Sequence, residues 1–256
     1  MIVNKVREKM VKGEKVVGVF SALESTAAIE CLGLMGLDFV ILDSEHGPQD
    51  ATEMLPLILA AERRDIVPFI RPKDATRPSI LKALDMGAMG LVIPFIKTVD
   101  EVKKIIEFGK FAPLGQRGFG GGRKSGYATF PESKDIFDYF ETCNRETLLF
   151  PQCETVESLN CIEEIVALDG VDGIFVGPMD LSISLGKTAQ WEDPVFTDAV
   201  KKVAKACNAA GKFCWTIGGT PEAAKMHFKN GYDGVASGDY SLLMQAATQY
   251  VKSCKE

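Results

Sequence analysis

The segment of residues 38–50 joins a short apolar run to groups that can perform acid–base chemistry. The run at residues 39–42 is typical of a strand buried on both faces. It is followed by Asp43, Glu45 and His46, one of only two histidines in the chain. An imidazole titrates near neutral pH, so His46, with Asp43 nearby to orient it, could act as a general base. The alternative is that both are ordinary polar loop residues.

Two further carboxylates follow other predicted strands. Gln152 and Glu154 share one face of their strand end, with Cys153 turned away, because side chains alternate along a strand. Asp180 follows the next predicted strand. Carboxylates from neighbouring strands suit a hard divalent cation such as Mg²⁺ or Mn²⁺, which keeps positions for water and substrate. Alternatively, each carboxylate simply sits at a helix N-terminus, where the helix dipole favours negative charge.

Arginines form the third group of candidates. Arg71 directly follows the predicted strand at residues 67–70, and its planar guanidinium suits a carboxylate; the alternative is a structural ion pair at the rim of the sheet. A glycine-rich segment at residues 117–124 carries Arg117, Arg123 and Lys124. It does not match the dinucleotide-binding pattern. It could be a lid that grips a distal carboxylate, or an exposed loop or subunit contact.

The elements that must position these groups alternate regularly along the chain. Eight strands are expected, at residues 16–20, 39–42, 67–70, 90–93, 147–152, 173–176, 213–217 and 234–237. A helix precedes the first strand, and an amphipathic segment around residues 136–143 is inserted between strands 4 and 5. Alternating strands and helices predict a parallel sheet, and eight such units predict an α/β (β/α)8 TIM barrel formed as one domain by residues 1–256. An open doubly wound sheet would need a glycine-rich turn after the first strand, and residues 21–24 offer none.

Helix signals support this alternation. Helices are expected at residues 51–63, 156–168, 194–209 and 240–251, among others. Asp50 with Glu53 and Thr98 with Glu101 predict capping boxes. Thr220 followed by proline predicts another helix start. In a barrel all the strand ends that carry candidate groups meet at one mouth.

Composition excludes several classes of protein. Among 256 residues, 35 acidic against 29 basic side chains give a net charge of −6, which argues against nucleic-acid binding. No apolar run approaches the roughly 18 residues of a membrane span, and the charged N-terminal residues do not resemble a signal peptide. Seven cysteines without a CxxC pair predict reduced thiols and a cytoplasmic protein, and none has the setting of a catalytic nucleophile.

In these residues and in the motifs around them, the chain resembles the HpcH/HpaI family of class II pyruvate aldolases, a branch of the phosphoenolpyruvate/pyruvate barrel superfamily. The similarity covers essentially the whole chain in order. The matching stretches are Asp-x-Glu-His at 43–46, Arg-Pro at 71–72, Gly-Ala-x-Gly-Leu-Val-Ile-Pro at 87–94, Arg-Gly at 117–118, Gln-x-Glu-Thr at 152–155, Gly-Val-Asp-Gly-Ile-Phe-Val-Gly-Pro-Met-Asp-Leu-Ser at 170–182 and Asp-Tyr-Ser-Leu-Leu at 239–243. The glycines at 120–122 depart from the family's lid and leave the substrate preference open.

The resemblance implies a role for each candidate. Glu154 and Asp180 would hold a divalent metal, Mg²⁺, Mn²⁺ or Co²⁺. Arg71 would bind the pyruvyl group, and His46, oriented by Asp43, would be the base. The substrate-binding set would be Arg71, Gln152, Pro178, Met179 and Asp180.

The implied reaction is reversible cleavage of a 4-hydroxy-2-oxoacid, of the 2-keto-3-deoxy sugar acid or 2,4-dihydroxyhept-2-enedioate type, to pyruvate and an aldehyde. The implied assembly is a homohexamer built as a trimer of dimers. Oxaloacetate decarboxylation would use the same groups, and a non-catalytic keto-acid-binding barrel would not need the base. A Schiff-base aldolase would need a lysine inside a strand, and no predicted strand contains one.

Overall fold

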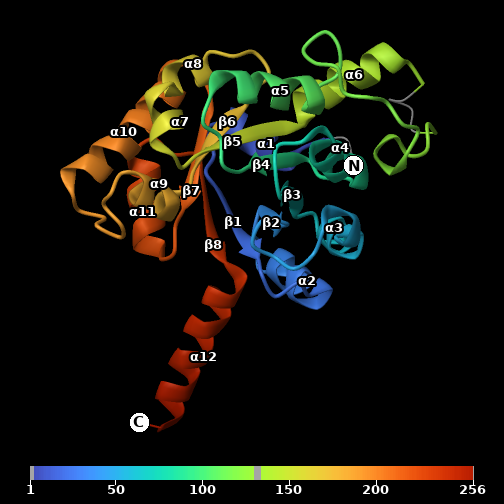
Figure 1. The fold of residues 1–256 in the computed structure, drawn as a ribbon. Helices are drawn as coiled ribbons and strands as arrows, with labels where there is room; N and C mark the ends of the chain where they lie inside the picture. The colour runs from blue at the N-terminus through green and yellow to red at the C-terminus, as the bar shows by residue number, and fades with distance from the viewer. Residues whose placement is uncertain (1–2, 130–133, 256) are drawn as a thin grey trace.

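The fold is built around eight parallel strands that close into a barrel in chain order (Figure 1). The computed structural model describes residues 3–129 and 134–255. The strands are β1 (Val16–Ser21), β2 (Phe39–Asp43), β3 (Val67–Arg71), β4 (Gly90–Ile93), β5 (Leu148–Cys153), β6 (Gly173–Val176), β7 (Phe213–Ile217) and β8 (Gly234–Gly238). The predicted TIM barrel is therefore confirmed, and each strand lies within one residue of its predicted bounds.

The helices lie outside the barrel, and most of them cover its strands (Figure 1). They are α1 (Lys5–Val11), α2 (Thr26–Leu34), α3 (Leu55–Arg63), α4 (Arg77–Met86), α5 (Val99–Gly109), α6 (Ile136–Glu146), α7 (Val156–Asn160), α8 (Ile162–Val166), α9 (Pro178–Ser184), α10 (Pro194–Ala209), α11 (Pro221–Lys229) and α12 (Asp239–Lys255), with short 3-10 turns η1 (Ala51–Glu53) and η2 (Arg123–Ser125). The expected N-terminal helix is α1, and α6 is the expected insertion between β4 and β5. The predicted capping boxes at Asp50 and Thr98 are present.

Two helices that the sequence predicts as continuous are divided. The helix expected from residue 51 to 63 consists of η1 and then α3, because Pro56 has no N–H and is tolerated only in the first turn. The helix expected from residue 156 to 168 breaks at Cys161 between α7 and α8. There the Cys161 thiol donates to the Glu157 carbonyl at 3.3 Å and so competes for a backbone acceptor.

The amino-terminal half of the barrel interior is filled by aromatic rings. The Trp215 ring stacks on Phe39 and Phe150, with centroid distances of 4.3 and 4.7 Å. Helix α1 lies against this layer, since Met10 packs its sulfur 3.1 Å from the indole nitrogen of Trp215. Asn4 ties the start of α1 to the strand ends by donating to the carbonyl of Met89. The interior of the barrel is thus filled at this end, so the barrel interior can be reached only from the carboxyl ends of the strands.

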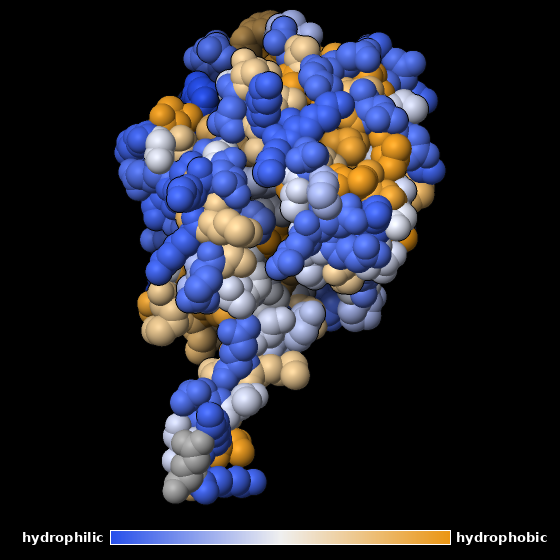
Figure 2. Space-filling model, turned by 90° about the vertical axis from the view of Figure 1, so that its left-hand side faces the viewer, coloured by the Kyte–Doolittle hydropathy of each residue, from blue (hydrophilic) through white to orange (hydrophobic). Residues whose placement is uncertain are grey.

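Helix α12 differs from the other helices because it leaves the barrel. Its red ribbon projects away from the molecule in Figure 1, and Figure 2 shows from another side that it stands clear. Large apolar side chains on it are exposed, among them Leu243 (56%), Met244 (64%) and Tyr250 (71%). No helix in the described part of the chain combines the length and apolar character needed to cross a membrane.

Candidate active site

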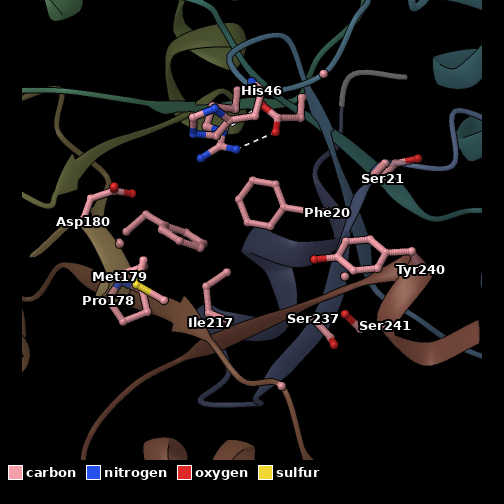
Figure 3. Close-up of a pocket in the computed structure, with 18 of the residues that line it drawn as sticks. Phe20, Ser21, His46, Pro178, Met179, Asp180, Ile217, Ser237, Tyr240 and Ser241 are labelled. Carbon is pink, nitrogen blue, oxygen red and sulfur yellow. Dashed lines mark hydrogen bonds and ion pairs between the residues drawn. The ribbon is translucent and has the colours of Figure 1, made fainter. Parts of the chain in front are cut away.

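The predicted site residues meet at the carboxyl ends of the strands. A cavity of about 570 Å³ opens there, and its lining includes Asp43, His46, Arg71, Gln152, Pro178, Met179 and Asp180. In Figure 3 His46 lies at the top of this cavity and Asp180 on the left, and the Phe20 ring points into its centre. Glu154 lines a second cavity of about 400 Å³, which shares His46 and Asp180 with the first. The sequence-predicted set is therefore brought together around two adjoining cavities.

Arg71 is held by two carboxylates at the ends of neighbouring strands. The register of β2 and β3 places Asp43 directly opposite Arg71. Nε and Nη2 of Arg71 donate to the two oxygens of Asp43 at 2.8 and 2.5 Å, and Nη1 lies 3.1 Å from Glu45. The guanidinium also lies over the Phe20 ring, 4.8 Å from its centroid. Burial alone would raise the pKa of Asp43, but the hydrogen bonds and charge of Arg71 outweigh it and lower that pKa.

His46 reaches the cavity without the partner that the sequence suggested. The oxygen Oδ1 of Asp43 accepts from the backbone N–H of Glu45 at 3.0 Å and of His46 at 3.4 Å. The imidazole instead lies near Glu45, with 3.9 Å between Nε2 and Oε2, and its side chain is 69% exposed. Among the described residues, no hydrogen bond joins the Asp43 carboxylate to the imidazole, and both oxygens of Asp43 pair with Arg71. The expectation that Asp43 orients the imidazole stays a prediction.

Glu154 is buried and fixed through both of its oxygens. Oε1 accepts from the backbone N–H of Phe95 and Oε2 from the side-chain amide of Gln152, each at 2.5 Å. Its pKa is raised to about 7, chiefly by burial and also by the charges of Glu45 and Asp180, against the lowering effect of the Phe95 N–H and of Arg71. A carboxylate crowded by like charges in a buried place is favourable only when a cation or a proton compensates it.

A divalent cation fits this set of donors. Asp180 lies in the first turn of α9, directly after β6, and its charge acts on Glu154. The oxygen Oε1 of Gln152 is buried without a hydrogen-bond partner in the described residues, so a polar group is missing beside the carboxylates. A side chain at Gly177 would lie 2.7 Å from Glu154 Oε2, so glycine is required for this approach. Within residues 3–129 and 134–255, no three His, Cys, Asp or Glu side chains group closely enough to hold a metal by themselves. Two carboxylates with water and substrate would suffice for Mg²⁺.

Comparison with known proteins identifies the family. Residues 16–242 match the family model described as HpcH/HpaI aldolase/citrate lyase. The chain belongs to this family. It is 30% identical over 247 residues to a 5-keto-4-deoxy-D-glucarate aldolase of Salmonella paratyphi C, covering 96% of this chain and 94% of that one.

Solved structures of HpcH/HpaI family proteins show the same fold. One from Burkholderia cenocepacia superposes with a TM-score of 0.91 at 27% identity, covering 99% of this chain and all of the other (100%). Another, an HpcH/HpaI aldolase from Desulfitobacterium hafniense, gives a TM-score of 0.89 at 26% identity, covering 98% and 96% of the two chains. Together with the aldolase-named relatives, the family makes this protein a carbon–carbon lyase.

The structure of this HpcH/HpaI family member adds site residues that the sequence did not single out. Phe20, Phe175, Ile217 and Trp191 form an apolar wall of the larger cavity. Phe20 and Phe175 meet edge to face, with ring centroids 5.7 Å apart. Tyr240, the second residue of α12, also lines the cavity. Phe20 is the next-to-last residue of β1 and Ile217 ends β7, so the rule that strand ends meet at the mouth could have found them.

The glycine-rich segment at residues 117–124 lies at the opposite end of the barrel. Lys124 donates to the carbonyl of Ala88, just before β4, and to the hydroxyl of Thr147, just before β5. Arg123 forms an ion pair with Glu62 at the end of α3. These anchors lie at the amino ends of the strands. In this chain the segment is therefore not a lid over its own active site.

Proposed function

We propose that this lyase is a divalent-metal-dependent class II aldolase that reversibly cleaves a 4-hydroxy-2-oxoacid to pyruvate and an aldehyde. The observation that carries the proposal is the fixed guanidinium of Arg71 on the same cavity as Asp180, with Glu154 on the adjoining one. A cation beside carboxylates that can hold a metal suits a 2-oxoacid, because such a substrate presents a carboxylate and a neighbouring oxo group.

Glu154 and Asp180 would hold the metal, Mg²⁺, Mn²⁺ or Co²⁺. When bound, the metal supplies Lewis-acid polarisation of the 2-oxo group. Gln152 keeps one amide group on Glu154, and its unpartnered oxygen is available to a substrate group or water. Polar groups that are already fixed in place, such as the Gln152 amide and the Glu154 carboxylate, need little reorganisation when charge develops during the reaction.

The side chains of the chain itself would move the proton and hold the charge. His46 takes the proton from the C4 hydroxyl, directly or through water, as the C3–C4 bond breaks. The electron pair of that bond becomes the pyruvate enolate, which Arg71 stabilises. Asp43 and Glu45 hold the guanidinium in one plane at the mouth. The apolar wall around Phe20 would exclude water once a substrate fills the cavity and so strengthen these charge interactions.

A Schiff-base mechanism has little support from the lysines at the site. Lys97 lines the smaller cavity, but its side chain is 40% exposed and lies 3.7 Å from Glu157. A lysine nucleophile needs a desolvated, lowered pKa, which burial rather than an acidic neighbour provides. Oxaloacetate decarboxylation is the second candidate, because it passes through the same enolate and would use the same arginine and carboxylates. A purely binding barrel would not need His46.

The substrate can be identified by a chain-length series. The name of the Salmonella relatives makes 5-keto-4-deoxy-D-glucarate the first compound to test. It would be compared with shorter 4-hydroxy-2-oxoacids, with a 2,4-dihydroxyhept-2-enedioate and with oxaloacetate, measuring pyruvate release with and without added metal. We expect metal-dependent cleavage with one preferred chain length. Decarboxylation of oxaloacetate without any aldol cleavage would favour the second candidate, and binding without turnover would favour the non-catalytic barrel.

We further propose that the protein works as a homo-oligomer, a hexamer built as a trimer of dimers, in the cytoplasm. The exposed apolar side chains of α12 support an assembly, because a helix that leaves its own barrel must cover these side chains elsewhere. Tyr240 connects α12 to the active-site cavity, so assembly and activity would be linked.

A further inference from the structure

A further, much smaller cavity lies at the amino-terminal end of the barrel, away from the two cavities of the active site. Its volume is about 60 Å³, which exceeds the space that one water needs. Its lining comes from α4, α6, the loop after α5 and the glycine-rich segment, and consists of Asp85, Phe111, Arg117, Phe119, Gly120, Gly122, Lys124 and Tyr139. The lining brings together two basic side chains, Arg117 and Lys124, and one acidic side chain, Asp85.

The guanidinium of Arg117, which lines this cavity, has N–H donors without a hydrogen-bond partner among the described residues. Its side chain is 2% exposed, and Nη2 pairs with Asp85 at 2.8 Å. The face of the guanidinium lies over Phe111, 4.7 Å from the ring centroid. Nε and Nη1 are buried and have no hydrogen-bond partner in the described part of the chain. Buried donors of a charged group are rarely left unpaired, because neither water nor protein then compensates their desolvation.

Lys124 is the second buried cation. Its ammonium donates to the Ala88 carbonyl and to the Thr147 hydroxyl, each at 3.0 Å, and both acceptors are neutral. An ammonium has three donors, so one more hydrogen bond is available in principle. Burial and the charge of Arg117 lower the pKa of Lys124 to about 7. A nearby negative group would favour its charged form.

The glycines beside the cavity are not explained by packing. A Cβ at Gly120 would meet no atom within 4 Å, and one at Gly122 would meet only a carbonyl oxygen at 3.9 Å. Neither residue has a positive φ. The N–H of Gly122 donates to the Gly120 carbonyl at 2.7 Å, and the open space at Gly120 leaves room beside the cavity.

From these contacts we propose that the cavity binds a small oxyanion, a carboxylate group or inorganic phosphate, between Arg117 and Lys124. The anion would accept hydrogen bonds from the unpartnered Nε and Nη1 of Arg117. The site is independent of the proposed aldolase reaction, because it lies at the end of the barrel opposite the mouth. It would be a structural or effector site rather than a part of the catalytic machinery.

The test compares two variants that differ only in charge. Gly120→Asp adds a carboxylate where a side chain has open space, and Gly120→Asn adds an amide of the same shape. Inorganic phosphate and, separately, acetate are titrated calorimetrically into the full-length wild type and both variants. We expect the preferred anion to bind to the wild type and to Gly120→Asn, and its affinity to fall about tenfold or more in Gly120→Asp. Equal affinities in the two variants would overturn the proposal.

A second comparison separates this cavity from the active site and from ordinary surface charge. Arg117→Met should lose the binding, whereas Arg123→Met, which removes a cation held by Glu62 outside the cavity, should keep it. Arg71→Met should also keep it. Loss in Arg71→Met alone would assign the anion to the active-site mouth, and no binding to the wild type at millimolar concentrations would mean that the cavity is not an anion site. If Arg117→Met does not fold, as judged by circular dichroism, the Gly120 pair decides.

Discussion

Arg71 and Asp43 form a two-point ion pair across the ends of two adjacent strands. The register of β2 and β3 pairs these residues, and both side chains are 12% exposed. The pair holds the guanidinium at the cavity. It also engages the Asp43 carboxylate, which the sequence suggested as a partner of the His46 imidazole. The Asp43 carboxylate thus contacts Arg71, and the Glu45 carboxylate lies 3.9 Å from the imidazole.

Arg71→Lys should lower turnover far more than its retained charge suggests. An ammonium is a point charge and cannot bond to both oxygens of Asp43 while it presents a second edge to an enolate. If the lost contact strengthens in the transition state, kcat should fall by about 10²-fold. Both aldol cleavage and oxaloacetate decarboxylation should fall, because both pass through the enolate, while metal affinity without substrate hardly changes.

The matched control for this variant is Arg64→Lys. Arg64 also donates two hydrogen bonds to a carboxylate, Glu30, but on the outside of the barrel. It should keep wild-type kcat. If Arg71→Lys also turned over at near the wild-type rate, Arg71 would be only a rim ion pair and the proposed substrate position would be wrong.

Chelation should abolish activity. We expect EDTA to stop pyruvate release and Mg²⁺, Mn²⁺ or Co²⁺ to restore it, because Glu154 and Asp180 would hold the metal. Glu154→Gln should weaken metal binding in a calorimetric titration, whereas Glu157→Gln, which removes an exposed carboxylate, should not. Borohydride with pyruvate should leave activity intact, and a pyruvyl-lysine adduct found by mass spectrometry would refute the metal mechanism.

His46→Ala should reduce kcat by about 10²–10⁴-fold without abolishing it, since this is the usual contribution of a general base. The imidazole is largely exposed at an open cavity, so added imidazole should restore part of the activity. Asp43→Asn should instead resemble Arg71→Lys and gain nothing from imidazole. An unchanged kcat in His46→Ala would remove it from the mechanism.

The oligomer should depend on α12. Multi-angle light scattering at micromolar concentration should show a hexamer, and Leu243→Asp and Tyr250→Asp should shift the mass downward because each puts a charge into a buried contact. Met226→Asp on α11 replaces an apolar residue that is 53% exposed, close to the 56% of Leu243, and should leave the mass unchanged. A monomeric wild type would contradict the assembly.

Lys124 should make stability depend on pH. Its folded pKa of about 7 lies below the ordinary value of 10.5, so between these pH values the unfolded chain binds more protons than the folded one. The free energy of unfolding should therefore rise from pH 7 toward pH 10. Lys124→Met keeps the apolar stem and removes the titration. Urea unfolding in phosphate-free buffer should show the wild type gaining stability relative to this variant as pH rises, and a constant difference would contradict the prediction.

The sequence by itself determined the barrel and the convergence of the site. Apolar strands alternating with capped helices allow few topologies, and strand ends in a parallel barrel must meet at one mouth. Asp43, Arg71, Glu154 and Asp180 could therefore be grouped without coordinates; their catalytic and metal-binding roles remain proposals.

Only the tertiary structure decided which side chain each of these groups contacts. Asp43 pairs with Arg71 because of the β2–β3 register, and local patterns do not specify the outcome of competition between two partners. The position of the 117–124 segment depends on anchors far along the chain, such as Thr147, and so could not be read from its glycines. The sequence also did not show that α12 projects away from the barrel. An amphipathic pattern shows that a helix needs an apolar partner but not which surface supplies it.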